Sequence, residues 1–276
     1  MIHRAARRSL LVLTLIGSAC GTQASIGPRI TAGKSAVVSN IPKRALSQFP
    51  SPISAALASL SSRMPMPLVA PLAIPANLSA KSTIAKSGYA VSLYRCESRF
   101  PLNSREIGSP PNCSGLAAYF GAFSGTRLTT TAAAHRLLSN AQRQQTRFCG
   151  PNTNSPQRIS VIRAVQGVLI GTNRFSGYCE MYFDLSGWSV FVGGNAVLRS
   201  IAAAKQEGLR VVDIMSKVRM PANSGNIVIE TAGDGNHTWL TWTIGQSLYT
   251  VSGYHTSSAA FAMAGSMAFV ASVPRK

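Results

Sequence analysis

The amino-acid sequence predicts an α+β fold in which an antiparallel sheet is built from strand–strand–helix units, with the helices covering one face of the sheet. Two observations predict this fold. Pairs of stretches in which apolar and polar residues alternate recur along the chain, and short turns separate the members of a pair. A stretch with apolar residues at helical spacing follows each pair. Because such a helix packs back on the hairpin before it, we expect one face of the sheet to carry the helices.

The first unit spans residues 86–146. The residue pattern predicts strands over 89–94 and 116–123, and a helix over 129–144. The apolar stripe of this helix consists of Ala134, Leu137, Leu138 and Ala141.

The second unit spans residues 178–218. Strands are predicted over 178–185 and 188–192, with a tight turn between them. A helix is then expected to begin at Asn195, to break at Gly208 and to resume until the end of the unit.

The third unit spans residues 225–270. Alternation over 227–231, 240–244 and 248–252 predicts three strands, and 257–269 predicts a helix rich in Ala and Met. The similar order of elements suggests that the three units are pseudo-repeats.

The first residues are typical of a secretory signal peptide, which we place at residues 1–20. Basic residues up to Arg8 precede the apolar run Leu10–Ile16, and small residues then lead to Cys20. This run is far shorter than the ~20 residues that a helix needs to cross a bilayer. We therefore expect an exported protein with an extracytoplasmic location.

Cys20 has two interpretations, which the sequence leaves open. As a lipoprotein cysteine it becomes the acylated N-terminus of a membrane-anchored protein, although Gly17 stands where that pattern has Leu. Alternatively, a signal peptidase cuts after Ala19 or after Ala24, and the second of these cuts discards Cys20 together with the signal peptide.

Four further cysteines lie in the body of the chain, and an even number in an exported protein predicts disulfides. We expect the pairs Cys96–Cys113 and Cys149–Cys179, because each joins neighbouring segments. Loops of this size contribute about 3–4 kcal/mol each to stability in the chain-entropy model. A zinc site is not expected, because no C-x-x-C pair occurs.

Residues 21–64 are predicted to form a mobile tether. The segment is rich in Ser, Ala and Pro and contains no acidic residue, although the spacing of Ile53, Leu57 and Leu60 fits a short helix. A run of prolines follows and excludes helix. We expect a single α+β domain over residues 65–274.

The formal net charge of +19 arises from a shortage of acidic residues, since residues 1–96 hold eleven Lys and Arg and no Asp or Glu. Three explanations stay open: contact with an anionic envelope surface, adaptation to an acidic exterior, and solubility. Nucleic acid is not an expected partner, because the basic residues are scattered and not interleaved with aromatic residues. An envelope protein is the other partner considered, and membrane contact is expected through an N-terminal lipid anchor alone.

A short pattern near the C-terminus carries a resemblance to a known family. The pattern consists of Trp242, Gly245, Tyr249, Val251 and Gly253, followed by a helix that ends in Ala-Gly-Ser-Met. It resembles the C-terminal module of uncharacterised bacterial secreted lipoproteins, and it is similar to domains of the lipoprotein-sorting and sigma-factor-regulator superfamily. The resemblance covers about 30 residues. It implies an extracytoplasmic module that binds or senses without catalysis, and it transfers no catalytic residue.

The sequence contains none of the motifs that carry catalysis in well-known enzyme classes. Thr131–His135 is similar to part of the histidine motif of trypsin-like proteases, but its surroundings are helical and no Gly-Asp-Ser-Gly follows. There is no His-Glu-x-x-His motif and no glycine-rich phosphate loop. We therefore predict no catalytic residues, no metal and no cofactor.

The aromatic residues offer the best candidate binding surface. Trp239 is expected on the opposite strand face from Trp242, where it forms with Tyr254 an exposed apolar platform for a lipid, a glycan or a partner chain. His237 and His255 complete this candidate surface. The sequence thus predicts an exported, non-catalytic binding or sensing protein. The alternatives are a secreted hydrolase with an unrecognised histidine and carboxylate site, and a structural envelope protein.

Overall fold

The computed structural model describes residues 41–111, 113, 115–147, 157–162, 165–172, 179–194, 201–232 and 235–271. The chain divides into two compact units, Met1–Ala36 and Val37–Lys276, and all of the described residues belong to the second unit. In chain order the elements are β1 (Lys43–Arg44), the 3-10 helix η1 (Leu46–Gln48), α1 (Ser51–Ser61), β2 (Val69–Pro71), β3 (Leu78–Ala85), β4 (Gly88–Arg95), α2 (Gly115–Ala118), β5 (Tyr119–Arg127), α3 (Thr131–Arg147), β6 (Gln157–Ile162), β7 (Val165–Thr172), β8 (Cys179–Leu185), β9 (Trp188–Gly194), α4 (Ile201–Lys217), β10 (Gly225–Ala232), β11 (Gly235–Ile244), β12 (Ser247–Gly253), α5 (Ser257–Gly265) and β13 (Met267–Val270).

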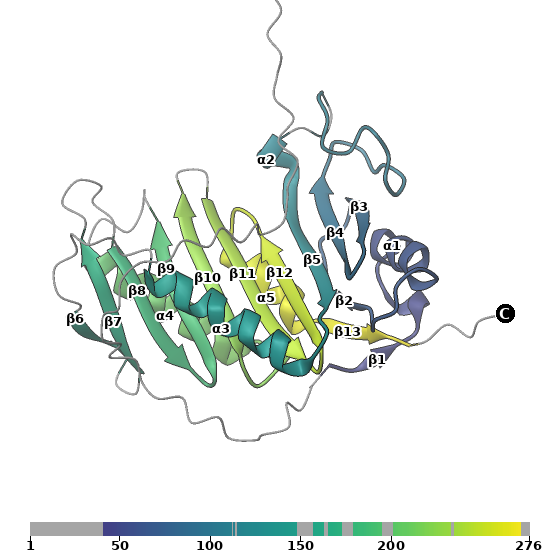
Figure 1. The fold of residues 1–276 in the computed structure, drawn as a ribbon. Coiled ribbons are helices and arrows are strands. Elements are labelled where there is room, and N and C mark those ends of the chain that lie inside the picture. Colours follow the sequence, from purple (N-terminus) through teal and green to yellow (C-terminus); the bar gives the residue numbers. More distant parts are fainter. Residues whose placement is uncertain are drawn as a thin grey trace, which may run out of the picture. The chain divides into compact units, whose positions relative to one another are not determined.

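Most of the strands form one large sheet, whose order is β3-β4-β5-β12-β11-β10-β9-β8-β7-β6 within the described part of the chain (Figure 1). Neighbouring strands of this sheet run antiparallel, except for β9 and β10, which are parallel and are joined through α4. A smaller sheet has the order β1-β13-β2. The predicted mixture of helices with a mostly antiparallel sheet is therefore confirmed.

The register gives the large sheet one apolar face and one polar face. Because residues paired between neighbouring strands lie on the same face, each row of partners across the sheet can be followed. One row is almost completely buried and consists of Phe183, Val190, Ile227, Leu240, Val251, Phe123 and Val91. We call the side on which it lies the core face.

The adjacent row, which points to the opposite side, carries short polar side chains. It consists of Asp184, Ser189, Asn226, Thr241, Thr250 and Ser124. We call this side the polar face. Trp242 lies on the core face and Trp239 on the polar face, as the alternation of the strand predicts.

Helices lie against both faces of the sheet, in contrast to the prediction that they cover one. On the core face, α5 lies against β11 and β12, and a Cβ added to Gly253 would stand 2.8 Å from the backbone nitrogen of Ala260. Helix α4 lies against β8 and β9 on the same face. Helix α3 instead crosses the polar face over β10, β11 and β12 (Figure 1). The connectivity fits this position. Helix α3 lies between β5 and β6 in the chain, β6 is the far edge strand of the sheet, and α4 and α5 occupy the core face.

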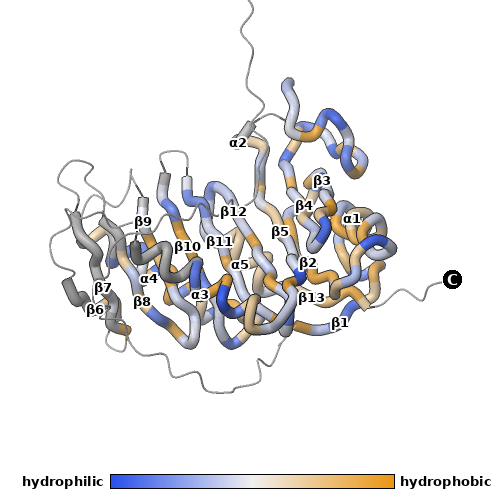
Figure 2. The backbone as a smooth tube through the Cα atoms, viewed as in Figure 1, coloured by the Kyte–Doolittle hydropathy of each residue, from blue (hydrophilic) through white to orange (hydrophobic). Residues whose placement is uncertain are grey.

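The prediction of a tether over residues 21–64 is wrong for residues 41–64, the part of this segment that the structure describes, because they form β1, η1 and α1. Residues 51–61 form α1, in which Ile53, Leu57 and Leu60 are completely buried, so the spacing that fitted a short helix marks a helix of the core. Figure 2 shows hydrophobic residues concentrated in α1, β2 and β13. The single domain therefore begins before residue 65.

Two predicted helix boundaries also differ from the structure. Helix α4 continues through Gly208, which is buried against Met181, so a glycine that was expected to break the helix instead allows it to approach the sheet closely. The predicted start of this helix at Asn195 lies outside the described residues. Helix α5 ends at Gly265, and Met267–Val270 form β13, which pairs with both β1 and β2.

Among the described residues, no helix combines the length and the apolar character needed to cross a membrane.

Two buried tyrosines of the large sheet form hydrogen bonds with the start of β2 and with the residues just before it. The Tyr89 hydroxyl donates to the Val69 carbonyl at 2.8 Å and accepts from the Val69 amide at 2.8 Å. The Tyr249 hydroxyl donates to the Pro67 carbonyl at 3.0 Å. Burial raises the pKa of both phenols, to about 12 for Tyr249, because a phenolate in the core would lose its hydration.

This shift predicts a loss of stability at alkaline pH. Above pH ~10 the unfolded chain loses the Tyr249 proton while the folded protein keeps it, so the free energy of unfolding falls as pH rises from ~10 to 12. The expected slope is about 1.4 kcal/mol per pH unit for this group. Urea denaturation from pH 9 to 12 measures it, and Tyr249→Phe reduces the slope by that amount. An equal slope in the Tyr249→Phe variant would contradict the account.

Candidate binding site

A connected group of aromatic rings lies on the polar face, and we call it the aromatic cluster. The rings of Tyr94 and Tyr119 are 5.6 Å apart between centroids, and those of Tyr119 and Tyr254 are 6.2 Å apart. Tyr254 lies 4.1 Å from the His237 ring, which in turn lies 5.7 Å from Trp239. Edge-to-face contacts predominate, an arrangement that the quadrupoles of aromatic rings favour.

The strand register explains why these rings meet. Tyr94 near the end of β4 pairs with Tyr119 at the start of β5. His237 and Trp239 alternate along β11 and therefore point to the same side. Tyr254 follows β12 directly, and its amide donates to the Phe120 carbonyl at 3.0 Å, which fixes the chain where it leaves the strand.

The structure brings together the four residues of the predicted binding surface, but it does not expose all of them. Trp239 and His237 are half-buried, and His255 is exposed and lies 4.2 Å from the Tyr254 ring between centroids. Tyr254 is only 3% exposed, because the rings of Tyr119 and the two histidines surround it. Tyr254 thus supports the other rings and does not itself form an exposed platform.

Hydroxyl, imidazole and carboxylate groups lie beside the aromatic rings. The Tyr119 hydroxyl is 3.3 Å from the Ser252 hydroxyl, and burial raises the pKa of Tyr119 and of Tyr94, so both remain protonated well above neutral pH. Glu230 on β10 stands directly opposite His237 on β11. The site therefore offers ring edges and faces together with neutral hydrogen-bonding groups and one carboxylate.

A second polar group, which the sequence did not reveal, lies on the same face at β8 and β9. Ser189 donates to the Asp184 carboxylate at 2.8 Å, and the Tyr182 hydroxyl lies 3.1 Å from that carboxylate and 3.0 Å from Ser189. Burial is the main cause that raises the pKa of Tyr182. The Oδ1 of Asn226, beside Ser189, is buried and has no hydrogen-bond partner within the described part of the protein. The signal in the sequence was the two-residue turn after β8, because it places Ser189 opposite Asp184.

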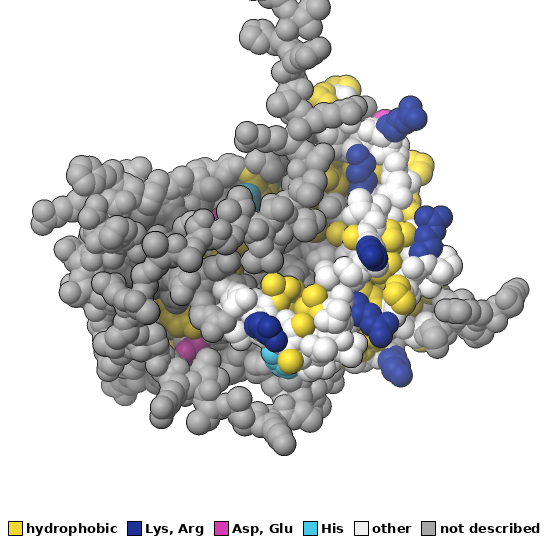
Figure 3. All heavy atoms as spheres, in the orientation of Figure 1, with side chains coloured by type: hydrophobic (Ala, Val, Ile, Leu, Met, Phe, Trp, Pro, Cys, Tyr) yellow, Lys and Arg dark blue, Asp and Glu magenta, His cyan; other side chains and the backbone are white. Residues whose placement is uncertain are grey.

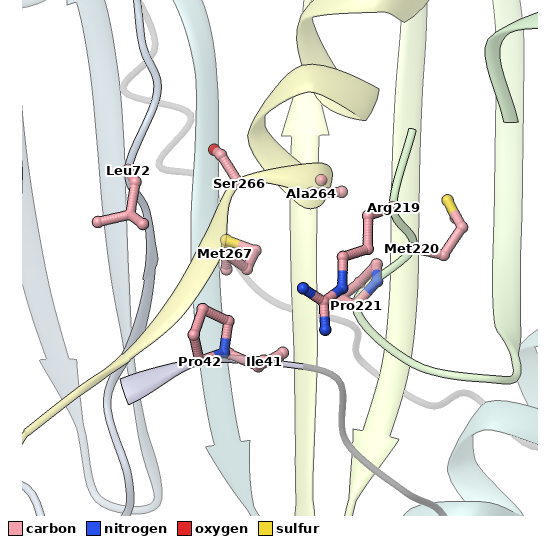
Figure 4. Close-up of a pocket in the computed structure, with 10 residues that line it drawn as sticks. Ile41, Pro42, Leu72, Arg219, Met220, Pro221, Ala264, Ser266 and Met267 are labelled. Atoms are coloured by element: carbon pink, nitrogen blue, oxygen red, sulfur yellow. The ribbon is translucent and has the colours of Figure 1, made fainter. Parts of the chain in front are cut away.

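The hollow drawn in Figure 4 is small and lies between the small sheet, the end of α5 and the chain that follows α4. Its volume is about 80 Å³. The residues that line it are Ile41, Pro42, Leu72, Arg219, Met220, Pro221, Ala264, Gly265, Ser266 and Met267. This mostly apolar lining offers a single charged group, Arg219, and the space suits a few atoms only.

The predicted disulfide between Cys96 and Cys113 is formed. It closes a loop whose Ile107 is completely buried against Cys113, so the bridge holds a small apolar cluster of its own. Cys20 and Cys149 lie outside the described residues, and Cys179 is the first residue of β8. The expected Cys149–Cys179 pair and the fate of Cys20 therefore stay predictions.

His135, the histidine of the protease-like segment, is exposed on α3. Within the described ranges, no three His, Cys, Asp or Glu side chains are grouped so that they could hold a metal ion. Comparison with models of protein families, with curated proteins and with solved structures gave no match.

Proposed function

We propose that this protein is an exported binding or sensing protein of the cell exterior, and that it takes its ligand at the aromatic cluster. The observation that carries the proposal is the continuous contact of rings from Tyr94 to Trp239 on a sheet face that is otherwise lined with short polar side chains. Trp188 and Trp242 are buried on the core face, whereas Trp239 and His237 on the polar face keep part of their surface exposed.

The chemistry of the site favours a ligand with an apolar face and a rim of hydroxyl or amide groups, such as a sugar ring. The half-buried rings of Trp239 and Tyr119 supply apolar contact, and the hydroxyls of Tyr119 and Ser252 supply hydrogen bonds. A glycan of the cell envelope has this chemistry, and an exported protein meets it. The resemblance to secreted lipoproteins supports the same kind of role.

Two observations support export. Residues 1–20 have the pattern of a signal peptide, and a disulfide of the Cys96–Cys113 kind persists in oxidising compartments. Whether Cys20 carries a lipid is decided by mass spectrometry of the mature N-terminus. An acylated Cys20 gives a membrane-anchored protein, and an N-terminus at Ser25 gives a secreted one.

Trp239 allows a direct test of the binding site by fluorescence. Because Trp188 and Trp242 are completely buried, a ligand on the polar face should change the emission of Trp239 selectively. We expect a saturable change when a soluble tetramer of N-acetylglucosamine is added, and we expect Trp239→Phe to abolish it. An emission change that persists in the Trp239→Phe variant would place the ligand elsewhere.

One observation favours a second candidate function, the secreted hydrolase. Glu230 faces His237 across β10 and β11, which is the arrangement of a carboxylate that orients a histidine base. Release of free N-acetylglucosamine from the same tetramer, lost in His237→Ala, would support the hydrolase and contradict the non-catalytic proposal.

A further inference from the structure

The β1–β5 part of the protein exposes many basic side chains and few acidic ones. Figure 3 shows Lys and Arg side chains spread over this part of the surface with almost no acidic side chain among them. The ion pairs found in the described residues both lie within α4, where Glu207 pairs with Arg210 and Asp213 pairs with Lys217. The basic residues of β1–β5 are thus not neutralised by such pairs.

Five of these basic residues lie near the end of the large sheet at which β3 turns into β4. We call them the basic end, and they are Lys43, Arg44, Arg63, Lys86 and Arg127, all of which are exposed.

Hydrogen bonds from Arg127 connect the segments that carry three of the five. Lys86 lies in the β3–β4 turn, and the Arg127 amide at the end of β5 bonds the carbonyl of the next residue, Ser87, at 2.6 Å. The Arg127 guanidinium donates to the Pro65 carbonyl at 2.8 Å, two residues after Arg63.

The other two basic residues lie in the small sheet at this end of the molecule (Figure 1). Lys43 and Arg44 form β1, which pairs with β13, and β13 pairs with β2. Val69 of β2 is held by the Tyr89 hydroxyl at the β3–β4 end of the large sheet. No acidic residue occurs in the sequence from 41 to 96, so these segments bring no negative charge with them.

Both ends of the described chain meet at the basic end. Ile41, the first described residue, lies two residues before the start of β1, and the amide of Ala271, the last described residue, donates to the Arg44 carbonyl at 2.8 Å. Residues 272–276 contain two more basic residues, Arg275 and Lys276. The first and the last described residue therefore both lie beside β1, which carries two residues of the basic end.

We propose that the basic end docks the protein on an anionic lipid bilayer. Basic groups near an anionic membrane surface are attracted by its negative potential, and this attraction falls off within about a Debye length. Ile41, the described residue nearest in sequence to Cys20, lies two residues before Lys43 of the basic end. The inference rests on the proposed export, but it does not depend on what the aromatic cluster binds.

Sedimentation with phospholipid vesicles tests the proposal. All proteins are the exported mature chain with Cys20→Ala, so that no acyl chain contributes. The triple variant Lys43→Gln/Arg63→Gln/Lys86→Gln should bind phosphatidylglycerol vesicles about 100-fold more weakly than the parent, since each basic group near the surface contributes about fivefold. The matched control is Arg95→Gln/Arg99→Gln/Arg105→Gln, which removes the same charge at the other end of β4 and should weaken binding less than about fivefold.

Three results would overturn the proposal. Equal losses in the two triple variants would show attraction to net charge without orientation. Equal binding of the parent to phosphatidylcholine vesicles would exclude a role of charge. Binding to soluble dextran sulfate without binding to vesicles would indicate an anionic polymer as the partner. Each of these results leaves the fluorescence test at Trp239 unaffected, so failure of this inference and failure of the proposed function are distinguishable.

Discussion

Leu57→Ala is expected to lower the free energy of unfolding by about 3 kcal/mol. Leu57 is completely buried in α1, and α1 packs on β3 and β4 at the core face. Removing its side chain loses the burial of apolar surface and leaves a cavity that a packed core fills only in part. Urea denaturation followed by circular dichroism measures the change.

Ser61→Ala on the same helix is the matched control. Ser61 is exposed, and its hydroxyl bonds only the Ala58 carbonyl one turn earlier, so the expected change is within about 0.5 kcal/mol. If Leu57→Ala cost no more than Ser61→Ala, residues 51–61 would be the tether that the composition suggested.

The second large effect is expected from Cys96→Ala/Cys113→Ala, which should cost about 3 kcal/mol under oxidising conditions. The bridge joins positions 17 residues apart and restricts the unfolded chain. It also holds the loop in which Asn103 covers the edge strand β3. The Asn103 side-chain carbonyl accepts from the Ser82 backbone amide at 2.6 Å, and the Asn103 backbone amide donates to the Ala80 carbonyl at 3.1 Å.

Loss of the contacts between this loop and β3 should also promote aggregation. An uncovered edge strand offers unpaired backbone groups to other chains, so we expect the double variant to aggregate faster on heating than the parent. Light scattering during a thermal ramp measures this, and Ser98→Ala, an exposed position in the same loop, is the control. Unchanged stability and unchanged scattering in the double variant would show that the loop holds its place without the bridge.

The sequence pattern predicted the elements whose residues alternate or repeat clearly. The hairpin of β11 and β12 and the opposite placement of Trp239 and Trp242 follow from period-two alternation, and the turn between β8 and β9 follows from Ser186–Gly187, both of which have positive φ. Local pattern decides these features, so no knowledge of distant contacts is required.

Other elements could not be predicted, because distant contacts decide them. The segment of β3, Leu78–Ala85, contains only two strongly hydrophobic residues, Leu78 and Ile84, and it becomes a strand by pairing with β4. Met267–Val270 continues the apolar character of α5, yet it forms β13 because β1 and β2, more than 190 positions earlier, offer backbone partners. Helix α3 has an apolar stripe that fits either sheet face, so its side was undetermined.

The candidate site was foreseen only in part, since Tyr94 and Tyr119 of the aromatic cluster were not among the expected residues. Alternation placed Trp239 opposite Trp242 on its strand, whereas the burial of Tyr254 depends on Tyr119 from β5, a contact with no local signal. The group of Tyr182, Asp184 and Ser189 was missed for a different reason. The turn after β8 predicts that Ser189 stands opposite Asp184, but the three residues match no known motif, so the turn alone did not mark them as a site.

Calorimetric titration with the N-acetylglucosamine tetramer tests the central claim, that the aromatic cluster is the ligand site, most directly. We predict saturable binding by the parent protein, weakened at least about tenfold in Trp239→Ala, since a central aromatic contact commonly dominates a binding site. Leu209→Ala removes a more exposed apolar side chain, on α4, and should leave the affinity unchanged. Absence of binding by the parent, or equal affinity of the parent and Trp239→Ala with both proteins folded, would contradict the account.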